Sequence, residues 1–275
     1  MTGAGPALHV VIGTGGTDPL DGSKFATRSP GPLDVIQWRT PTGTLRTERP
    51  SPALLHERLW ETQPVRRGVQ YPNRRNQHGL YFWPRTGEHV WYESGLELAS
   101  LVDLDYQGQA VHIAAQPFRL LFRRQSPATY HDPDFFAVHA NGDQVVYDVK
   151  PSDRITPKAV DQFAETARIC DAVGWRHVVL TETHAQRTAN LEFLRSTRHT
   201  RCHPPTERLE HLLSVFDGAR PIGEGIAMAD CRHPALVMPH VRHLLWHHHL
   251  RVDLEQHLDF DTIATTTGRS TPCCG

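Results

Sequence analysis

The chain has 275 residues, 39% of them hydrophobic, with 20 Gly, 21 Pro and a net charge of −1, which indicates one or two domains with irregular chain around a modest core. No apolar run is long enough to span a bilayer, and the amino terminus lacks the basic segment of a signal peptide. No pair of its five cysteines has metal-ligand spacing, so the sequence predicts a reduced, soluble, cytoplasmic protein and argues against membrane-spanning and secreted classes.

The amino-terminal part divides into a tail and the beginning of a domain. Residues 1–32 are rich in Gly, Pro, Thr and Ser, and we expect a flexible tail there. The run at 10–16 partly resembles a nucleotide-binding loop, but it completes neither the dinucleotide nor the Walker pattern. Short extended pieces such as 35–38 follow, and 54–60 is a candidate helix.

A segment from 66 to 87 combines arginines with aromatic residues and contains no acid. Arginines beside aromatic rings suit phosphate contact and base stacking, although an ordinary hairpin that packs its aromatic residues on a core would look the same. The predicted DNA-contacting residues are those of this segment and of a second basic group further along the chain: Arg66, Arg67, Arg74, Arg75, Arg85, Arg119, Arg123 and Arg124.

The next elements are a helix and an extended segment. Ser94 followed by Glu97 is a capping-box pattern, and apolar residues at helical spacing continue to residue 104. Residues 111–122 are predicted to be extended with an interruption at Pro117, which cannot donate a ladder hydrogen bond.

Residues 131–151, with the sequence H-D-P-D-F-F-A-V-H-A-N-G-D-Q-V-V-Y-D-V-K-P, predict a β-hairpin. Asn-Gly at 141–142 is a strong hairpin signal, and the return strand spans 145–150. Side chains alternate along a strand, so Asp148 and Lys150 project to one face, and the hairpin can bring Asp134 beside them.

Two carboxylates with an ammonium group nearby suit metal-assisted phosphodiester hydrolysis. The carboxylates of Asp134 and Asp148 are hard oxygen ligands for Mg²⁺, and Lys150 can orient water or offset charge on phosphate. The chain has only 3 lysines among its 29 basic residues, so a lysine at 150 is itself informative. Glu97 is the candidate third ligand and Glu93 a weaker rival. The alternatives are an exposed hairpin with solvated charges and a Glu97 that only closes its capping box.

After the hairpin, residues 156–173 predict an amphipathic helix with Pro157 in its first turn and Gly174 at its end, and 175–180 predict a short strand. We therefore expect an α/β domain over 33–182, with the order helix, three strands, helix, strand.

The carboxy-terminal part, 183–260, is predicted to be a small helical, winged-helix-like module. Helices are expected at 191–195, 207–216 and 237–250, with a break at 218–223 and a short strand at 251–254. Histidines at 243 and 247–249 have no second ligand set at zinc-binding spacing, which favours a polar helix face. Residues 261–275 are expected to be disordered.

The order of elements over residues 88–182 resembles the PD-(D/E)xK, restriction-endonuclease-like nucleases. More narrowly, four motifs in order resemble TnsA, the endonuclease subunit of heteromeric transposases, and a fifth resembles actinobacterial TnsA-like proteins: S-G-L-E at 94–97, Q-P-F at 116–118, P-D-F-F at 133–136, D-V-K-P at 148–151 and G-W-R-H at 174–177. The resemblance implies that Glu97, Asp134 and Asp148 are metal ligands and Lys150 is a catalytic lysine.

By the same resemblance, the chain is expected to cleave double-stranded DNA at the 5′ ends of a transposon, with Mg²⁺ as cofactor and Mn²⁺ as a substitute. Its implied partners are a DDE-type transposase, which acts on the 3′ ends, and an AAA+ regulator, which docks on the carboxy-terminal module. A stand-alone restriction or repair nuclease is the alternative within the enzyme class. A catalytically silent DNA-binding or scaffolding subunit is the alternative outside it.

Overall fold

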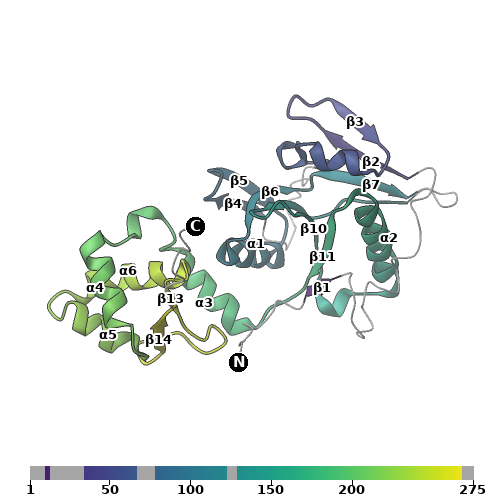
Figure 1. Ribbon diagram of the computed structural model, residues 1–275. Coiled ribbons are helices and arrows are strands. Elements are labelled where there is room, and N and C mark those ends of the chain that lie inside the picture. Colours follow the sequence, from purple (N-terminus) through teal and green to yellow (C-terminus); the bar gives the residue numbers. More distant parts are fainter. Residues whose placement is uncertain (1–9, 13–33, 67–77, 123–128, 268–275) are drawn as a thin grey trace, which may run out of the picture. The chain divides into compact units, whose positions relative to one another are not determined.

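The computed structural model describes residues 10–12, 34–66, 78–122 and 129–267 (Figure 1). The chain divides into two compact units, Met1–Glu182 and Thr183–Gly275. The division falls where the composition of the sequence changes. The structure is mixed α/β, and no helix within the described ranges is both long and apolar enough to cross a bilayer.

The first unit is organised around a five-stranded sheet. In spatial order its strands are β1 (Val10–Ile12), β11 (Arg176–Leu180), β10 (Gln144–Val149), β9 (Phe135–His139) and β6 (Ala110–Ala115). The pair β10–β11 is parallel and the other pairs are antiparallel. Helices α1 (Gly95–Gln107) and α2 (Pro157–Val173) lie on opposite sides of β10 and β11 in Figure 1.

A second sheet and a separate hairpin complete this unit. The four-stranded sheet has the order β3 (Leu45–Glu48), β2 (Val35–Arg39), β7 (Phe118–Phe122) and β8 (Thr129–His131). The hairpin pairs β4 (Gly79–Trp83) with β5 (Glu88–Tyr92), and short 3-10 helices occupy Pro52–His56, Leu59–Glu61 and Ser152–Arg154.

The interruption predicted at Pro117 is where the chain leaves one sheet for the other. Gln116 has a positive φ of 47°, β6 before it belongs to the five-stranded sheet, and β7 after it belongs to the four-stranded sheet. The chain returns through the segment between β8 and β9. Where three strands were expected between the two helices, the described residues therefore form five: β6, β9 and β10 belong to the main sheet, and β7 and β8 lie outside it.

The core of this unit lies between the two sheets and α2. Phe118 and Leu120 of β7 are fully buried together with Phe136 of β9 and Ile169 of α2. The ring of Trp175 stacks on Phe118 with centroids 5.1 Å apart. Burial of such side chains from both sheets fixes how the sheets meet.

Helix ends in this unit follow the local signals in the sequence. The Ser94 hydroxyl accepts a hydrogen bond from the Glu97 backbone at the start of α1, as the capping box predicts. Thr156 caps α2 in the same way, Pro157 is its first residue, and Gly174 ends it. The predicted strand at 175–180 is confirmed as β11.

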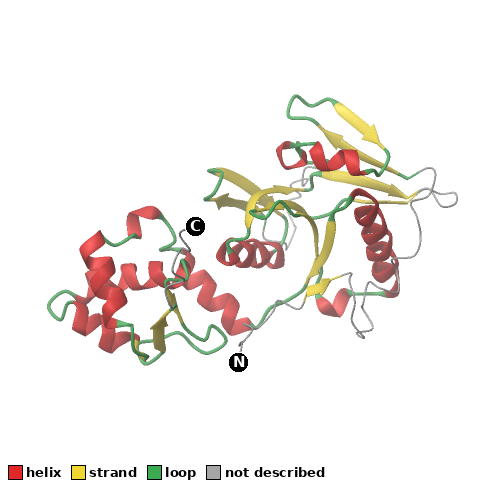
Figure 2. Ribbon diagram, in the orientation of Figure 1, coloured by secondary structure: helices red, strands yellow, loops and turns green. Residues whose placement is uncertain are grey.

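Within its described residues, 183–267, the second unit contains four α-helices and a small three-stranded sheet. Figure 2 shows the helices in red and the strands in yellow. The helices are α3 (Ala185–Arg195), α4 (Thr206–Val215), α5 (Ile222–Ala229) and α6 (Pro234–Trp246), and a 3-10 helix spans Thr200–Cys202. The sheet has the order β12 (Arg220–Pro221), β14 (Ile263–Thr266) and β13 (Leu250–Arg251).

Several local predictions were wrong because pairing with distant segments outweighs local composition. Val10–Ile12, expected in a flexible tail, pairs with β11. Ile263–Thr266, expected to be disordered, is the central strand of the small sheet.

The break expected at 218–223 is also wrong in part, because α5 begins at Ile222. Glycines suit this helix, since a Cβ at Gly225 would overlap the Phe216 ring. The polar helix face expected for the histidines at 243 and 247–249 is wrong for His243, which is buried, whereas residues 247–249 are exposed and follow the end of α6.

Candidate active site

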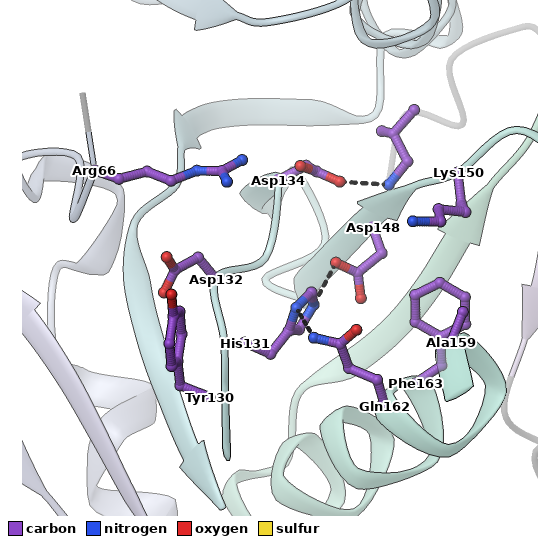
Figure 3. A pocket seen from close by; sticks show the side chains of 11 residues that line it. Arg66, Tyr130, His131, Asp132, Asp134, Asp148, Lys150, Ala159, Gln162 and Phe163 are labelled. Atoms are coloured by element: carbon purple, nitrogen blue, oxygen red, sulfur yellow. Dashed lines mark hydrogen bonds and ion pairs between the residues drawn. The ribbon is translucent and has the colours of Figure 1, made fainter. Parts of the chain in front are cut away.

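A pocket of about 270 Å³ opens where the two sheets of the first unit converge (Figure 3). Three of the four predicted catalytic residues, Asp134, Asp148 and Lys150, line it. His131, Gln162 and Arg66 contribute to the same lining.

Strand register explains why the two aspartates meet. The last ladder pair of the hairpin is Phe135 with Tyr147, so continuing the register by one residue places Asp134 opposite Asp148. The Asp134 carboxylate accepts a hydrogen bond of 2.7 Å from the Val149 backbone N–H. The turn that fixes this register is the predicted one, with Gly142 at φ 90°.

The environment of Asp134 favours its protonated form. Burial, which is the largest cause, and the nearby carboxylates of Asp148 and Glu97 together raise its pKa to about 8. The hydrogen bond from the Val149 backbone opposes this shift. The charge of His131 also opposes the shift, but it does not cancel the effects of burial and of the neighbouring carboxylates.

Asp148 is buried as well, but its surroundings stabilise the charged form. Burial alone would raise its pKa, yet His131 and His177 outweigh burial and hold the pKa well below the usual range for an aspartate. The Nε2 atom of His131 donates to Oδ1 at 2.7 Å, and the Nε2 atom of His177 donates to Oδ2 at 2.8 Å. The two facing aspartates are thus electrostatically different.

His131 is supported in turn by helix α2. The amide Nε2 of Gln162 donates to Nδ1 of His131 at 2.7 Å when the histidine is neutral. Burial lowers the pKa of His131, but the charges of Asp148, Asp134 and Asp132 outweigh it, and the pKa is raised overall. A chain of polar contacts therefore runs from α2 through His131 to Asp148 (Figure 3).

Lys150 follows β10 directly and stays aligned with the sheet, because its backbone N–H donates to the Leu180 carbonyl at 2.9 Å. Alternation along the strand places its side chain on the same face as Asp148. Figure 3 shows its amino group pointing toward the two aspartates. Among the residues that the structure describes, none forms a hydrogen bond or ion pair with this ammonium group.

Glu97 does not join the pocket. Its carboxylate accepts from the Glu93 backbone N–H at 2.7 Å and from the Ser94 hydroxyl at 3.0 Å. Burial raises the pKa of Glu97. Within the described ranges, no group of three His, Cys, Asp or Glu side chains is arranged to hold a metal ion. The predicted three-ligand set is therefore not assembled here, although the charge of Glu97 acts on Asp134.

The predicted DNA-contacting arginines have different surroundings. Arg66 lines the pocket and pairs with Glu93 at 3.0 Å. The guanidinium of Arg119 lies over the Tyr130 ring at 4.1 Å from the centroid, and Arg85 donates to the Gly108 carbonyl at 2.6 Å. The remaining predicted contacts lie outside the described residues: Arg67, Arg74, Arg75, Arg123 and Arg124.

Two aromatic residues of the basic segment belong to the core. Tyr81 and Trp83 are buried, the Tyr81 hydroxyl donates to Asp105 at 2.7 Å, and the Trp83 indole donates to the Val111 carbonyl at 3.0 Å. For these residues the ordinary hairpin interpretation is confirmed, and they cannot stack on bases.

Sequence reasoning missed the two histidines and Gln162. His131 directly precedes the D-P-D motif and His177 ends the G-W-R-H motif, so one is adjacent to a motif already of interest and the other belongs to one. The sequence does not show that both histidines bind Asp148, because this contact depends on how β8, β10 and β11 pack against one another.

No protein-family model and no curated protein matches this sequence.

The residues of the pocket fit a divalent cation. Mg²⁺ is commonly bound through one or two carboxylates, with water and substrate phosphate completing its coordination. Asp134 and Asp148 offer this donor set, because their carboxylates face each other across the paired strands and both line the pocket.

Proposed function

We propose that this chain is a Mg²⁺-dependent DNA endonuclease. The observation that supports this most directly is the shared pocket of Asp134, Asp148 and Lys150, built on paired strands and flanked by α2. The order α1, β6, β9, β10, α2, β11 of the main sheet and its helices agrees with a restriction-endonuclease-like core.

In this proposal Asp134 and Asp148 hold the metal, and Mn²⁺ can replace Mg²⁺. A bound ion would polarise the scissile phosphate and lower the pKa of an attacking water. A bound cation would favour the ionised form of Asp134, because its positive charge would oppose the effects of burial and of the neighbouring carboxylates that raise this pKa. Lys150 places its ammonium beside the reacting phosphate and offsets the charge that develops there.

The substrate is double-stranded DNA, and the chain acts as the TnsA-like subunit of a heteromeric transposase that cuts the 5′ ends of the element. The near-neutral net charge supports a nuclease that binds DNA weakly alone and is recruited by partners, because phosphate neutralisation provides most non-specific DNA affinity. The partners are a DDE-type transposase and an AAA+ regulator. The second unit, a winged-helix-like module, is the docking site for the regulator.

Cleavage of a labelled element end by the purified chain, alone and with the two partner proteins, tests the proposal. Specific Mg²⁺-dependent cutting only in the presence of partners is the expected result. Robust site-specific cutting by the chain alone would instead identify a stand-alone nuclease. Absence of cutting under every condition, with DNA binding retained, would identify a silent subunit.

A further inference from the structure

The carboxylate of Asp148 is held by two histidines that come from different parts of the fold. His131 is the last residue of β8 in the four-stranded sheet, whereas His177 lies on β11 in the five-stranded sheet. Each donates from Nε2 to a different oxygen of Asp148, at 2.7 and 2.8 Å. Both carboxylate oxygens are thus fixed from two directions.

Register accounts for the position of His177. Asp148 pairs with Val179 in the parallel ladder, and His177 precedes Val179 by two residues, so the three side chains share one face of the sheet. The His177 ring contacts Phe163 of α2, with centroids 6.1 Å apart. Phe163 therefore restricts the ring that reaches Asp148.

His131 is restricted by the same helix. Gln162, the neighbour of Phe163 on α2, binds Nδ1 of His131 at 2.7 Å, which leaves Nε2 to donate to Asp148. The side chains of His131 and His177 are only 13% and 6% exposed, so water cannot easily replace either contact. The two rings hold one orientation of the carboxylate.

This arrangement leaves Asp148 able to bind a further group. An ionised carboxylate has about four acceptor positions, and the two histidines use one on each oxygen. Asp148 also lines the pocket, opposite Asp134. A buried carboxylate that only satisfied the core would not need to face a pocket that contains a second carboxylate and a lysine.

We propose that His131 and His177 are positioning residues that orient Asp148 as a ligand of the divalent cation, with Gln162 fixing His131. The proposal rests on the proposed function, because it assigns the pair a role toward the metal of that site. Substitution of a group that hydrogen-bonds to a metal ligand typically weakens metal binding by about 10–100-fold.

Binding of Mn²⁺ alone to the full chain, measured by electron paramagnetic resonance, tests this role without activity as the readout. We expect His131→Leu and His177→Leu each to weaken Mn²⁺ binding by about 10–100-fold. The Gln substitutions at the same positions should recover most of the affinity, because an amide N–H can replace the Nε2 donor. Gln162→Leu should weaken binding less, since it acts only through His131.

His139→Leu is the matched control. His139 is buried, binds the Tyr147 hydroxyl at 2.9 Å, and is on the opposite face of the sheet from Asp134 by strand alternation. We expect this variant to lose thermal stability while keeping the Mn²⁺ affinity of the parent chain. If a leucine variant at 131 or 177 fails to fold, the Gln162→Leu variant and the glutamine variants still decide the question.

The outcomes separate the two proposals. Parental affinity in the folded His131→Leu, His177→Leu and Gln162→Leu variants would overturn the positioning role while leaving the metal site in place. Absence of Mn²⁺ binding by the parent chain would overturn the metal site, and the positioning role with it. A loss of affinity that glutamine does not recover, matched by the His139→Leu control, would show a general effect of core disruption and contradict the proposal.

Discussion

Histidines serve different purposes in the two units of this protein. In the first unit, His131 and His177 donate to the carboxylate of Asp148. In the second unit, Nδ1 of His243 donates to the Thr197 carbonyl at 2.8 Å and Nε2 of His247 donates to the Arg198 carbonyl at 2.9 Å. The first pair binds a charged group beside a pocket, and the second binds the backbone.

The partners decide the electrostatic state of each group. Nearby carboxylates raise the pKa of His131 despite its burial. Burial lowers the pKa of His243 to about 4, and the neighbouring histidines His247 and His203 add to that effect. The sequence clusters histidines most densely in the second unit, yet the first unit contains the arrangement suited to chemistry. Density of a residue type along the chain is therefore a poor guide to function when the partners are unknown.

The largest expected effect follows removal of the carboxylate that the first pair binds. Asp148→Ala should abolish Mg²⁺-dependent cleavage, because one of the two carboxylates in the pocket is lost. It should also lower the melting temperature, since each histidine Nε2–H left without an acceptor costs about 1–3 kcal/mol, partly offset by relief of the repulsion with Asp134. A plasmid-nicking assay and thermal melts measure both effects.

Asp143→Ala is the control, because Asp143 is a half-buried residue at the turn of the same hairpin that pairs with Arg176 at 3.3 Å and does not line the pocket. Cleavage by purified Asp148→Ala at the parental rate would remove Asp148 from the site.

A smaller but still large effect is expected for the lysine of the pocket. Lys150→Ala should reduce the rate of cleavage by about 10²–10⁴-fold while changing Mn²⁺ affinity little, because its ammonium acts on charge that develops during the reaction. Lys150→Arg should recover little activity, since the guanidinium is larger and cannot release a proton near neutral pH. Single-turnover kinetics at saturating Mg²⁺ measure the loss.

Lys158→Ala, which changes an exposed lysine in the first turn of α2, should behave as the parent chain. Parental rates in the arginine variant would show that only positive charge is needed at position 150.

The stability of the first unit should depend on pH through Asp134, in the direction opposite to that expected for the second unit. The pKa of Asp134 is about 8 in the folded protein and about 4 in an unfolded chain, so the folded state binds more protons between these values. Stability should therefore fall as pH rises through this window when no divalent ion is present. Asp134→Asn should remove that loss, so its stability advantage over the parent should grow from pH 5 to pH 8.

Urea unfolding at several pH values in the presence of a chelator measures the difference. If the difference in unfolding free energy between Asp134→Asn and the parent chain stayed constant from pH 5 to pH 8, Asp134 would not have a raised pKa.

The smallest effect is expected in the second unit, and its pH dependence has the opposite direction. The pKa of His243 is about 4 when folded and about 6.5 when unfolded, so the unfolded state binds more protons between these values and stability falls as pH decreases through them. His243→Leu should lower the free energy of unfolding by about 1–3 kcal/mol at pH 7, because the buried Thr197 carbonyl loses its hydrogen-bond donor. As pH decreases, the variant should lose less stability than the parent chain does. Mn²⁺ affinity should not change.

Thermal melts from pH 4 to pH 7 test this prediction. A loss of Mn²⁺ binding in this variant would contradict the division of roles between the two groups of histidines.

Local signals in the sequence were sufficient for many elements of the first unit. The Asn-Gly turn, the capping box at Ser94, and the proline and glycine that bound α2 act over a few residues, and the structure contains all of them. The alternation of strand side chains also placed Asp148 and Lys150 in one pocket with Asp134. Each of these inferences depends on backbone geometry that neighbouring residues determine.

Only the tertiary structure decided what surrounds the site. Glu97 has the right chemistry for a ligand, but its own helix terminus binds its carboxylate, whereas Asp148 receives histidines from β8 and β11, 17 and 29 residues away in the sequence. The sequence determined which side chains share a face and where elements begin and end. Which buried groups satisfy one another depended on how the two sheets and α2 pack, because hydrogen bonds between distant segments leave no periodic pattern along the chain.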